Sequence, residues 1–374
     1  MLGHLAALCG QLLVVGLAGV ELSSGERRAL EAGARGGVVL FRRNIVPGPE
    51  GLPRVAALVR NVLAASPADL PPLVAIDQEG GRVVRIGPPA LALPPMRRIG
   101  DLGDVDFATR LAEAQARELA ALGITMSFAP VADIHTRPEN PIIGDRAFAE
   151  TPAAVAKFAR AWAQGLARGR VLSCLKHFPG HGDTTVDSHL ALPRVERSRE
   201  ELERIELAPF RELAREPAVA SMMTAHVVYP ALDPGPATLS RAICTDLVRG
   251  AFGFEGTLFS DDLEMKAIQL PVGEAAVLAV AAGCDALLVC SREDLAVEAH
   301  EALVKEAERS AAFRSRCEGA RERFVAMRRR VPPTPAPDDA LPGVLEGSRP
   351  IANELATRLE SVRESRAETG GGRT

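Results

Sequence analysis

The amino-acid sequence predicts a single closed (β/α)₈ barrel of the TIM type. Eight short apolar runs recur along the chain, and segments with the apolar spacing of helices separate them. Apolar strands that alternate with helices are typical of a parallel sheet covered on its faces, and eight such units fit a closed barrel. The runs lie at residues 12–17, 37–41, 73–77, 125–129, 171–177, 219–227, 256–261 and 286–290.

The intervening segments carry the signals of helices. Apolar residues in segment 106–123 repeat every three to four positions. Thr151 stands where an N-cap is expected and Gly169 where that helix should end. Ser198 and Glu201 have the spacing of a capping box. A doubly wound open sheet is the alternative fold, and the lack of a GxGxxG motif after the first run weakens it without excluding it.

The chain is expected to divide near residue 331. Residues 1–331 would form the catalytic barrel, and residues 332–374 a Pro-rich, polar tail that is partly disordered. The stretch VPPTPAPDDALPG is typical of a linker on the protein surface, and we expect a short helix within residues 353–368.

Composition excludes several classes of function. The chain has 374 residues, a net charge of −4 and 4% aromatic residues, which gives no basis for a nucleic-acid partner. The six cysteines form no CxxC pair and lie mostly in apolar runs, so we expect buried, reduced thiols.

Residues 5–20 resemble the core of a signal peptide, but no Lys or Arg precedes them, and a buried first strand fits equally well. No other run approaches the length of a membrane span.

Ionisable side chains gather where the apolar runs end. The active site of such a barrel lies at the C-terminal ends of its strands, so this sorting by strand end predicts a catalytic face. Each residue also has a simpler interpretation: a turn for Asp77, a core histidine for His226, and helix caps for Asp261 and Asp262. The run ends in question carry Asp77, Lys176, His177, His226, Asp261 and Asp262, and the fourth run leads into a polar segment that ends in GDRAF.

The stretch KHFPGHGDTTVDSH, residues 176–189, holds three of the seven histidines. Asp187 lies two residues before His189, a spacing that lets a carboxylate orient an imidazole and makes His189 a candidate proton shuttle. Pro179, Gly180 and Gly182 fit an adaptable loop. Three classes of function stay open on these residues: metal-free group transfer, a non-catalytic sugar-binding barrel, and metal-dependent hydrolysis that uses the ligands His177, His181, Asp187 and His189.

Six motifs in order resemble the bacterial β-N-acetylglucosaminidases of glycoside hydrolase family 3. They cover roughly residues 10–310, and the sequence fits the family's compact form, without a second sandwich domain. The motifs are IDQEGGRVVR, GDRAF, KHFPGHGDTTVDSH, MTAHV, PATLS and FSDDLEM.

The resemblance implies a role for each matching residue. Asp261 matches the catalytic nucleophile, His189 the general acid/base, and Asp187 its partner in a dyad. By this resemblance the imidazole of His189 takes the role that a second carboxylate has in most retaining glycosidases. The residues that match those holding the N-acetylglucosamine ring are Asp77, Arg85, Arg146, Lys176 and His177.

The resemblance further implies a retaining exo-β-N-acetylglucosaminidase that acts on muropeptides with N-acetylglucosamine linked to anhydro-N-acetylmuramic acid. The compact form is similar to cytoplasmic enzymes of cell-wall recycling, and we expect a monomer with a small carbohydrate substrate. No metal or organic cofactor, nucleic acid or membrane partner is expected. A β-glucosidase or a glycoside phosphorylase on the same site is the alternative activity.

Overall fold

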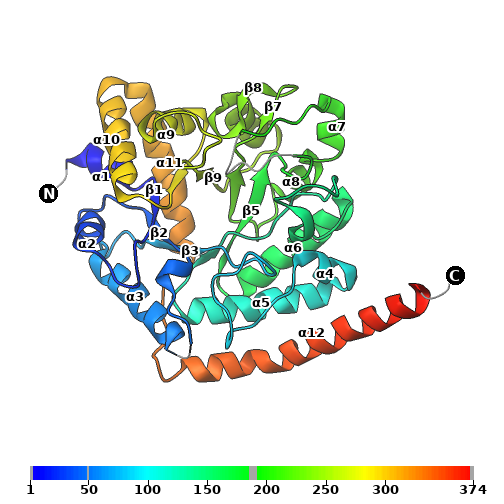
Figure 1. Ribbon diagram of the computed structural model, residues 1–374. Helices are drawn as coiled ribbons and strands as arrows, with labels where there is room; N and C mark the ends of the chain where they lie inside the picture. The colour runs from blue at the N-terminus through cyan, green and yellow to red at the C-terminus, as the bar shows by residue number, and fades with distance from the viewer. Residues whose placement is uncertain (1–2, 49, 185–191, 371–374) are drawn as a thin grey trace.

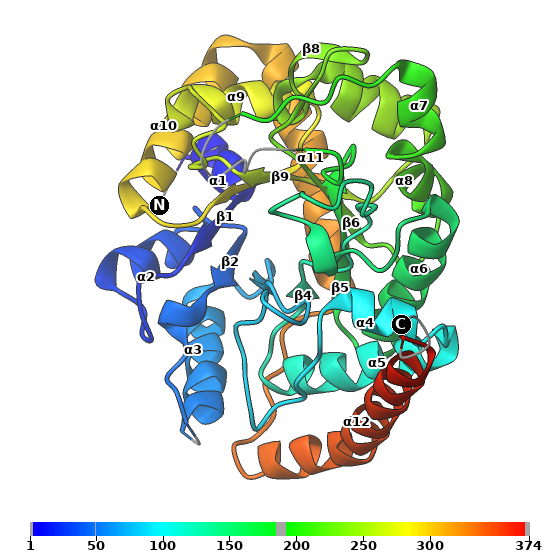
Figure 2. The same ribbon diagram turned by 45° about the vertical axis from the view of Figure 1, so that its right-hand side comes forward.

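The computed structural model describes residues 3–48, 50–184 and 192–370, with the remaining positions left out of the description. The described residues form a closed barrel of eight parallel strands in the order β1-β10-β9-β6-β5-β4-β3-β2 (Figures 1 and 2). Each predicted apolar run coincides with one of these strands to within one residue at its C-terminal end or contains it, so the predicted (β/α)₈ barrel is confirmed. The strands are β1 Leu13–Gly16, β2 Gly37–Leu40, β3 Leu73–Ile76, β4 Met126–Ser127, β5 Leu172–Phe178, β6 Ser221–Thr224, β9 Thr257–Asp262 and β10 Ala286–Val289.

Helices surround the barrel, and a short antiparallel pair, β7 Val228–Tyr229 and β8 Asp233–Pro236, follows β6. The α-helices are α1 His4–Gly10, α2 Ser24–Glu31, α3 Gly51–Ala65, α4 Met96–Asp101, α5 Val105–Ala121, α6 Pro152–Arg168, α7 Arg199–Arg204, α8 Leu207–Leu213, α9 Val272–Ala282, α10 Glu293–Arg309, α11 Ala311–Arg330 and α12 Leu341–Gly370. Short 3₁₀ helices are η1 Arg42–Asn44, η2 Gly144–Arg146 and η3 Ala237–Leu239, and η4 Ala242–Ala251 is a π-helix.

The helix boundaries follow their sequence signals. Thr151 and Gly169 flank α6 as N-cap and C-cap, although the Thr151 side chain makes no capping hydrogen bond. Ser198 and Glu201 form the predicted capping box at the start of α7. Gly165 lets α6 approach α5 closely, because a Cβ at this position would collide with the Thr109 carbonyl oxygen.

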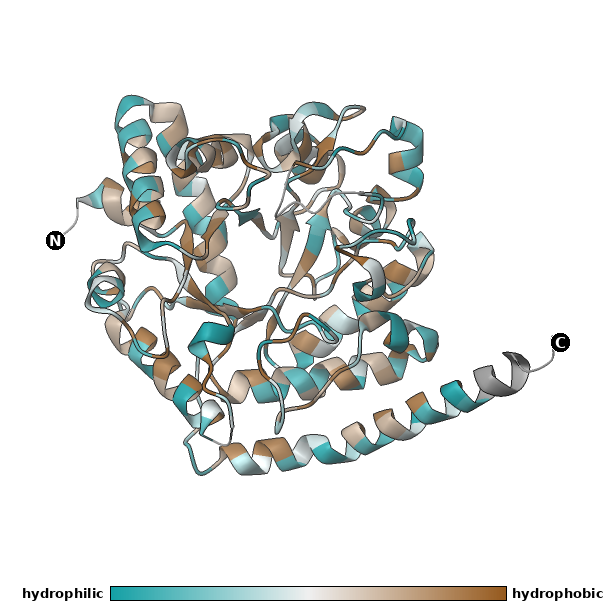
Figure 3. Ribbon diagram, in the orientation of Figure 1, coloured by the Kyte–Doolittle hydropathy of each residue, from teal (hydrophilic) through white to brown (hydrophobic). Residues whose placement is uncertain are grey.

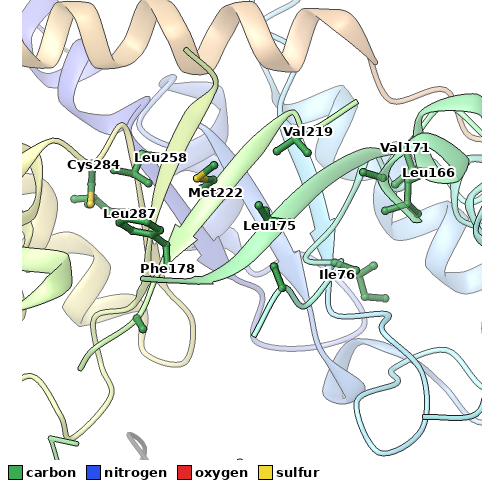
Figure 4. Packing of buried hydrophobic residues seen from close by; sticks show 14 of the residues in the cluster. Ile76, Leu166, Val171, Leu175, Phe178, Val219, Met222, Leu258, Cys284 and Leu287 are labelled. Carbon is green, nitrogen blue, oxygen red and sulfur yellow. The ribbon is translucent and has the colours of Figure 1, made fainter. Parts of the chain in front are cut away.

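Two apolar layers result from the alternation of side chains along the strands. The outward residues pack beneath the helices, as Figure 4 shows for Ile76, Leu175, Met222, Leu258 and Leu287. Figure 3 shows hydrophobic and hydrophilic residues alternating along outer helices such as α10 and α12. The inward residues fill the barrel together with Phe324 and Met327 of α11, which belong to the same inner cluster. The six cysteines are buried, as predicted.

The tail contains a longer helix than the sequence predicts. Helix α12 begins at Leu341, before the expected residue 353, and includes Pro350. It runs beside α5 (Figure 1), where Arg110 pairs with Glu354 and Arg358 pairs with Asp104. Packing and ion pairs against the barrel thus outweigh the low helix propensity of the Gly- and Pro-containing first half.

Candidate active site

Three strands carry a polar side chain at or near their C-terminal end that faces the inside of the barrel. Side chains two residues apart in a strand point the same way, so Asp77, Lys176 and Asp261 continue the inward-facing rows. The residues two positions earlier all belong to the inner apolar cluster: Ala75, Cys174 and Phe259. Asp77, Lys176 and Asp261 therefore meet at a cavity of about 210 Å³ at the C-terminal end of the barrel.

The same cavity collects the other sugar-binding residues that the sequence predicts. Arg85 reaches it because the Gln78 side chain accepts hydrogen bonds from the amides of Arg85 and Ile86, which folds the loop after β3 back on itself. Arg146 comes from η2, and His177 follows Lys176 in β5. Asp187 and His189 lie outside the described residues, so the structure says nothing of the predicted dyad.

A network of buried ion pairs forms one wall of the cavity. Lys176 Nζ lies 3.0 Å from Asp77 Oδ1 and 2.6 Å from Glu79 Oε1. Arg146 donates to both oxygens of Glu79, at 2.9 and 2.8 Å, and Arg85 donates to Asp77 Oδ2 at 3.0 Å. Charge-assisted bonds of this kind hold each group in a fixed orientation.

Pairing keeps this network ionised despite its burial. Burial alone would raise the pKa of Asp77, but the Lys176 and Arg85 charges outweigh it and the pKa is lowered. The pKa of Glu79 is held well below its usual range, because Arg146 and Lys176 overcome the same burial effect. Burial opposes the charge on Lys176 and Arg146 too, yet the facing carboxylates raise the pKa of both. The wall therefore holds hydrogen-bond donors and acceptors in fixed positions at the cavity.

Asp133 organises the two histidines next to this wall. Its Oδ2 lies 2.6 Å from His177 Nδ1, and its Oδ1 accepts the His181 amide at 2.6 Å. Burial would raise the pKa of Asp133, but the facing His177 outweighs it and the pKa is lowered. Because Asp133 fixes Nδ1, the Nε2 edge of His177 faces Arg146, 3.4 Å away.

His181 is buried in the segment that leads away from β5. Its Nδ1 lies 2.7 Å from Thr184 Oγ1, and Asn140 donates to the His181 and Gly182 carbonyl oxygens. Burial lowers the pKa of His181 to about 4, so the ring is neutral at physiological pH. These contacts fit a structural role in shaping the segment.

The opposite side of the cavity carries Asp261 and an apolar surface. The Asp261 carboxylate accepts a hydrogen bond from the Asp262 amide at 2.8 Å. Burial raises the pKa of Asp262 to about 7, although its Oδ1 accepts the amides of Glu264 and Cys290. Apolar side chains also line the cavity, some on this side and some, such as Phe41, beside Arg85: Val39, Phe41, Met223, Met265 and Leu288.

Sequence reasoning missed Glu79 and Asp133. Glu79 had a usable signal, because it lies two residues after Asp77 and a strand-like continuation places both on one side. Asp133 follows a short strand in an irregular segment, where no periodicity predicts the direction of a side chain.

Comparisons with known proteins identify the family of the chain. The N-terminal domain of glycosyl hydrolase family 3 matches residues 5–323. The chain belongs to glycoside hydrolase family 3. Within this family it is 40% identical over 299 residues to a β-hexosaminidase of Neisseria meningitidis serogroup C, which covers 78% of this chain and 81% of the relative.

Solved structures of the family share the fold. A family 3 β-N-acetylglucosaminidase from Paenibacillus sp. is 36% identical with a TM-score of 0.84, and the match covers 96% of this chain and 69% of that one. NagZ from Neisseria gonorrhoeae in complex with N-trifluoroacetyl-D-glucosamine is 33% identical with a TM-score of 0.77, and the match covers 93% and 98% of the two chains. The family 3 chain described here is accordingly a glycoside hydrolase of the β-N-acetylhexosaminidase type.

The family assignment leaves other predictions as they stood. The role of each site residue in this chain stays a prediction, as does the identity of the natural substrate. Among the described helices, none combines the length and apolar character that crossing a membrane requires.

Proposed function

We propose that this protein is a retaining exo-β-N-acetylglucosaminidase that releases terminal N-acetylglucosamine from muropeptides bearing anhydro-N-acetylmuramic acid. The observation that carries the proposal is the Asp261 carboxylate, which shares one cavity of about 210 Å³ with the buried Asp77–Lys176–Glu79–Arg146 network. A cavity of this size suits one terminal sugar ring, which fits exo action.

The polar wall would bind the hydroxyl groups of that ring. Lys176, Arg85 and Arg146 offer N–H donors, and the Asp77 carboxylate offers acceptors. The ion pairs already fix these groups before substrate arrives, so little reorganisation accompanies binding. Solvent exclusion within the cavity strengthens each polar interaction.

Two displacement steps at the anomeric carbon would follow. In the first, an Asp261 oxygen bonds to C1 while the C1–O bond to the aglycone breaks, and His189 donates its proton to the leaving oxygen. In the second, His189 takes a proton from water, the water oxygen bonds to C1, and the bond to Asp261 breaks. Both steps invert C1, so the product retains the β configuration. Asp187 would orient His189 and favour its protonated form.

The remaining proposals concern context. We infer a cytoplasmic monomer that works in cell-wall recycling, on the similarity to the compact enzymes of the family. We also propose the division at residue 331 into a catalytic barrel and a tail, with α12 of the tail docked on α5.

Hydrolysis of 4-nitrophenyl glycosides tests the proposal. We expect release of nitrophenol from the β-N-acetylglucosaminide, little from the β-glucoside, and the same rates with and without EDTA. A muropeptide disaccharide should yield free N-acetylglucosamine and the anhydro-sugar by mass spectrometry. Activity only on the glucoside would overturn the substrate, and loss of activity in EDTA would overturn the metal-free mechanism.

A further inference from the structure

His226 connects three segments that meet behind Asp261. It lies two residues after β6 and is fully buried. Its Nε2 lies 2.9 Å from the backbone oxygen of Asp262, and its Nδ1 lies 2.8 Å from Thr238 Oγ1 in η3. The ring therefore spans from η3 to the end of β9, where the nucleophile stands.

The Asp262 carbonyl oxygen settles which nitrogen of the ring carries a hydrogen there. A carbonyl oxygen can only accept, so His226 Nε2 carries a hydrogen and donates it to Asp262. In the neutral ring Nδ1 is then an acceptor for the Thr238 hydroxyl at 2.8 Å, a shorter contact than the 3.2 Å from that hydroxyl to the Ala225 carbonyl oxygen. Thr238 Oγ1 also lies 2.9 Å from Thr224 Oγ1, and both threonines are fully buried.

Asp262 transmits this constraint to Asp261. Its amide donates to Asp261 Oδ1 at 2.8 Å, and its carbonyl oxygen also accepts the Met265 amide at 3.1 Å. His226 thus holds Asp262 at its carbonyl oxygen, and the amide of Asp262 in turn holds the Asp261 carboxylate. One carboxylate oxygen is engaged in this way, which sets the direction in which the second one points.

We infer that His226 is a positioning residue for Asp261, oriented by Thr238 and acting through the backbone of Asp262. The inference rests on the proposed role of Asp261 as nucleophile. A misplacement of about 1 Å can slow a reaction roughly 100-fold. Loss of the His226 donor should therefore slow the attack on C1, while the sugar-binding wall, which comes from other strands, keeps its affinity.

Paired variants separate positioning from general stability. In His226→Gln the Nε2 amide group can still reach toward the Asp262 oxygen, whereas in His226→Asn the side chain is too short to do so. Thr238→Val removes the hydroxyl with little change of shape, and Thr238→Ser keeps it. His300→Asn is the matched control, because His300 Nε2 also contacts a backbone oxygen, that of Ala6, far from the cavity.

Two quantities decide the matter in the full chain. The first is the maximal rate of covalent labelling by the 5-fluoro glycosyl fluoride of N-acetylglucosamine, which reports the attack on C1. The second is the inhibition constant of free N-acetylglucosamine, which reports sugar binding. We expect His226→Asn and Thr238→Val to lower the labelling rate about 10- to 100-fold with little change in the inhibition constant. His226→Gln and Thr238→Ser should recover much of the rate.

Three outcomes would overturn the inference: unchanged labelling in His226→Asn and Thr238→Val, parallel loss of labelling and binding, or equal effects in His300→Asn. If His226→Asn does not fold, Thr238→Val and Thr238→Ser carry the test alone. Wild-type labelling at a residue other than Asp261 would instead refute the proposed nucleophile, so the two failures are distinguishable.

Discussion

The Lys176 ammonium lies 2.6 Å from Glu79 Oε1 inside the barrel, where both side chains are almost completely buried. Removing two such charges from water costs several kcal/mol each, and their attraction offsets this cost only because further partners complete the network. Arg146 and Asp77 are those partners. The enzyme thus keeps a rigid polar wall at an energetic cost, which is understandable where a polar substrate must bind.

Removal of Glu79 should destabilise the fold. Glu79→Ala leaves Lys176 without its shortest partner and Arg146 without its bidentate one, and breaking a buried pair in this way costs about 3–5 kcal/mol. Denaturant unfolding measures the change. Asp338→Ala, which breaks an exposed pair with Arg60, is the control and should have little effect. Equal stability of Glu79→Ala and wild type would show that the network does not hold as described.

Replacement of Glu206 should stabilise the protein at alkaline pH. Glu206 is buried at the start of α8, and burial raises the pKa of its carboxyl to about 7, although Arg197 lies 3.5 Å away. Because the pKa of this carboxyl is higher in the folded than in the unfolded chain, the contribution of Glu206 to the free energy of unfolding is fully present below about pH 4.5. It is lost as the pH rises through about 7.

The variant that tests this is Glu206→Gln. It cannot ionise, so its free energy of unfolding relative to wild type should be higher by about 3 kcal/mol at pH 8 than at pH 4.5. Unfolding curves at the two pH values give the comparison. A difference that does not depend on pH would contradict the assignment of the titration to Glu206.

His189→Ala should discriminate between leaving groups. A poor leaving group needs a proton as the C1–O bond breaks, and a 4-nitrophenolate does not. We expect a loss of about 100-fold or more in kcat/KM for the disaccharide and a much smaller loss for an activated aryl glycoside. Equal losses on both substrates would point to a structural role for His189.

Asp187→Asn should change the pH–rate profile. A neighbouring carboxylate raises the pKa of an imidazole. Replacement of that carboxylate by a neutral amide should therefore move the basic limb of kcat/KM toward lower pH by about one unit. The profile over pH 5–9 on one substrate provides the measurement. If kcat/KM falls and both limbs stay in place, the carboxylate does not set the protonation of the acid/base.

The sequence predicts the barrel well because its information is local. Each strand appears as a short apolar run, and the polar ends of β3, β5 and β9 mark the catalytic face without any knowledge of three-dimensional contacts. The same logic brings Asp77, Lys176 and Asp261 together.

Other features depend on contacts between distant segments. Asp133 meets His177 across 44 residues, and nothing in the irregular segment after β4 indicates this. Helix α12 begins in a Pro- and Gly-containing stretch that local propensity assigns to a linker. The helix is instead stabilised by α5, which lies more than 200 residues earlier in the chain, for example through the pairing of Arg110 with Glu354. His226 was identified as a strand-end residue, but its bond to Asp262 required the folded chain.

The most direct test of the account is to identify the residue that bonds covalently to the sugar. Wild-type protein labelled with the 5-fluoro glycosyl fluoride of N-acetylglucosamine is digested, and the modified peptide is sequenced by mass spectrometry. We predict one added sugar per chain, carried by Asp261, and no adduct in Asp261→Ala. A label on another residue, or turnover without any covalent adduct and with inverted product, would contradict covalent catalysis by Asp261.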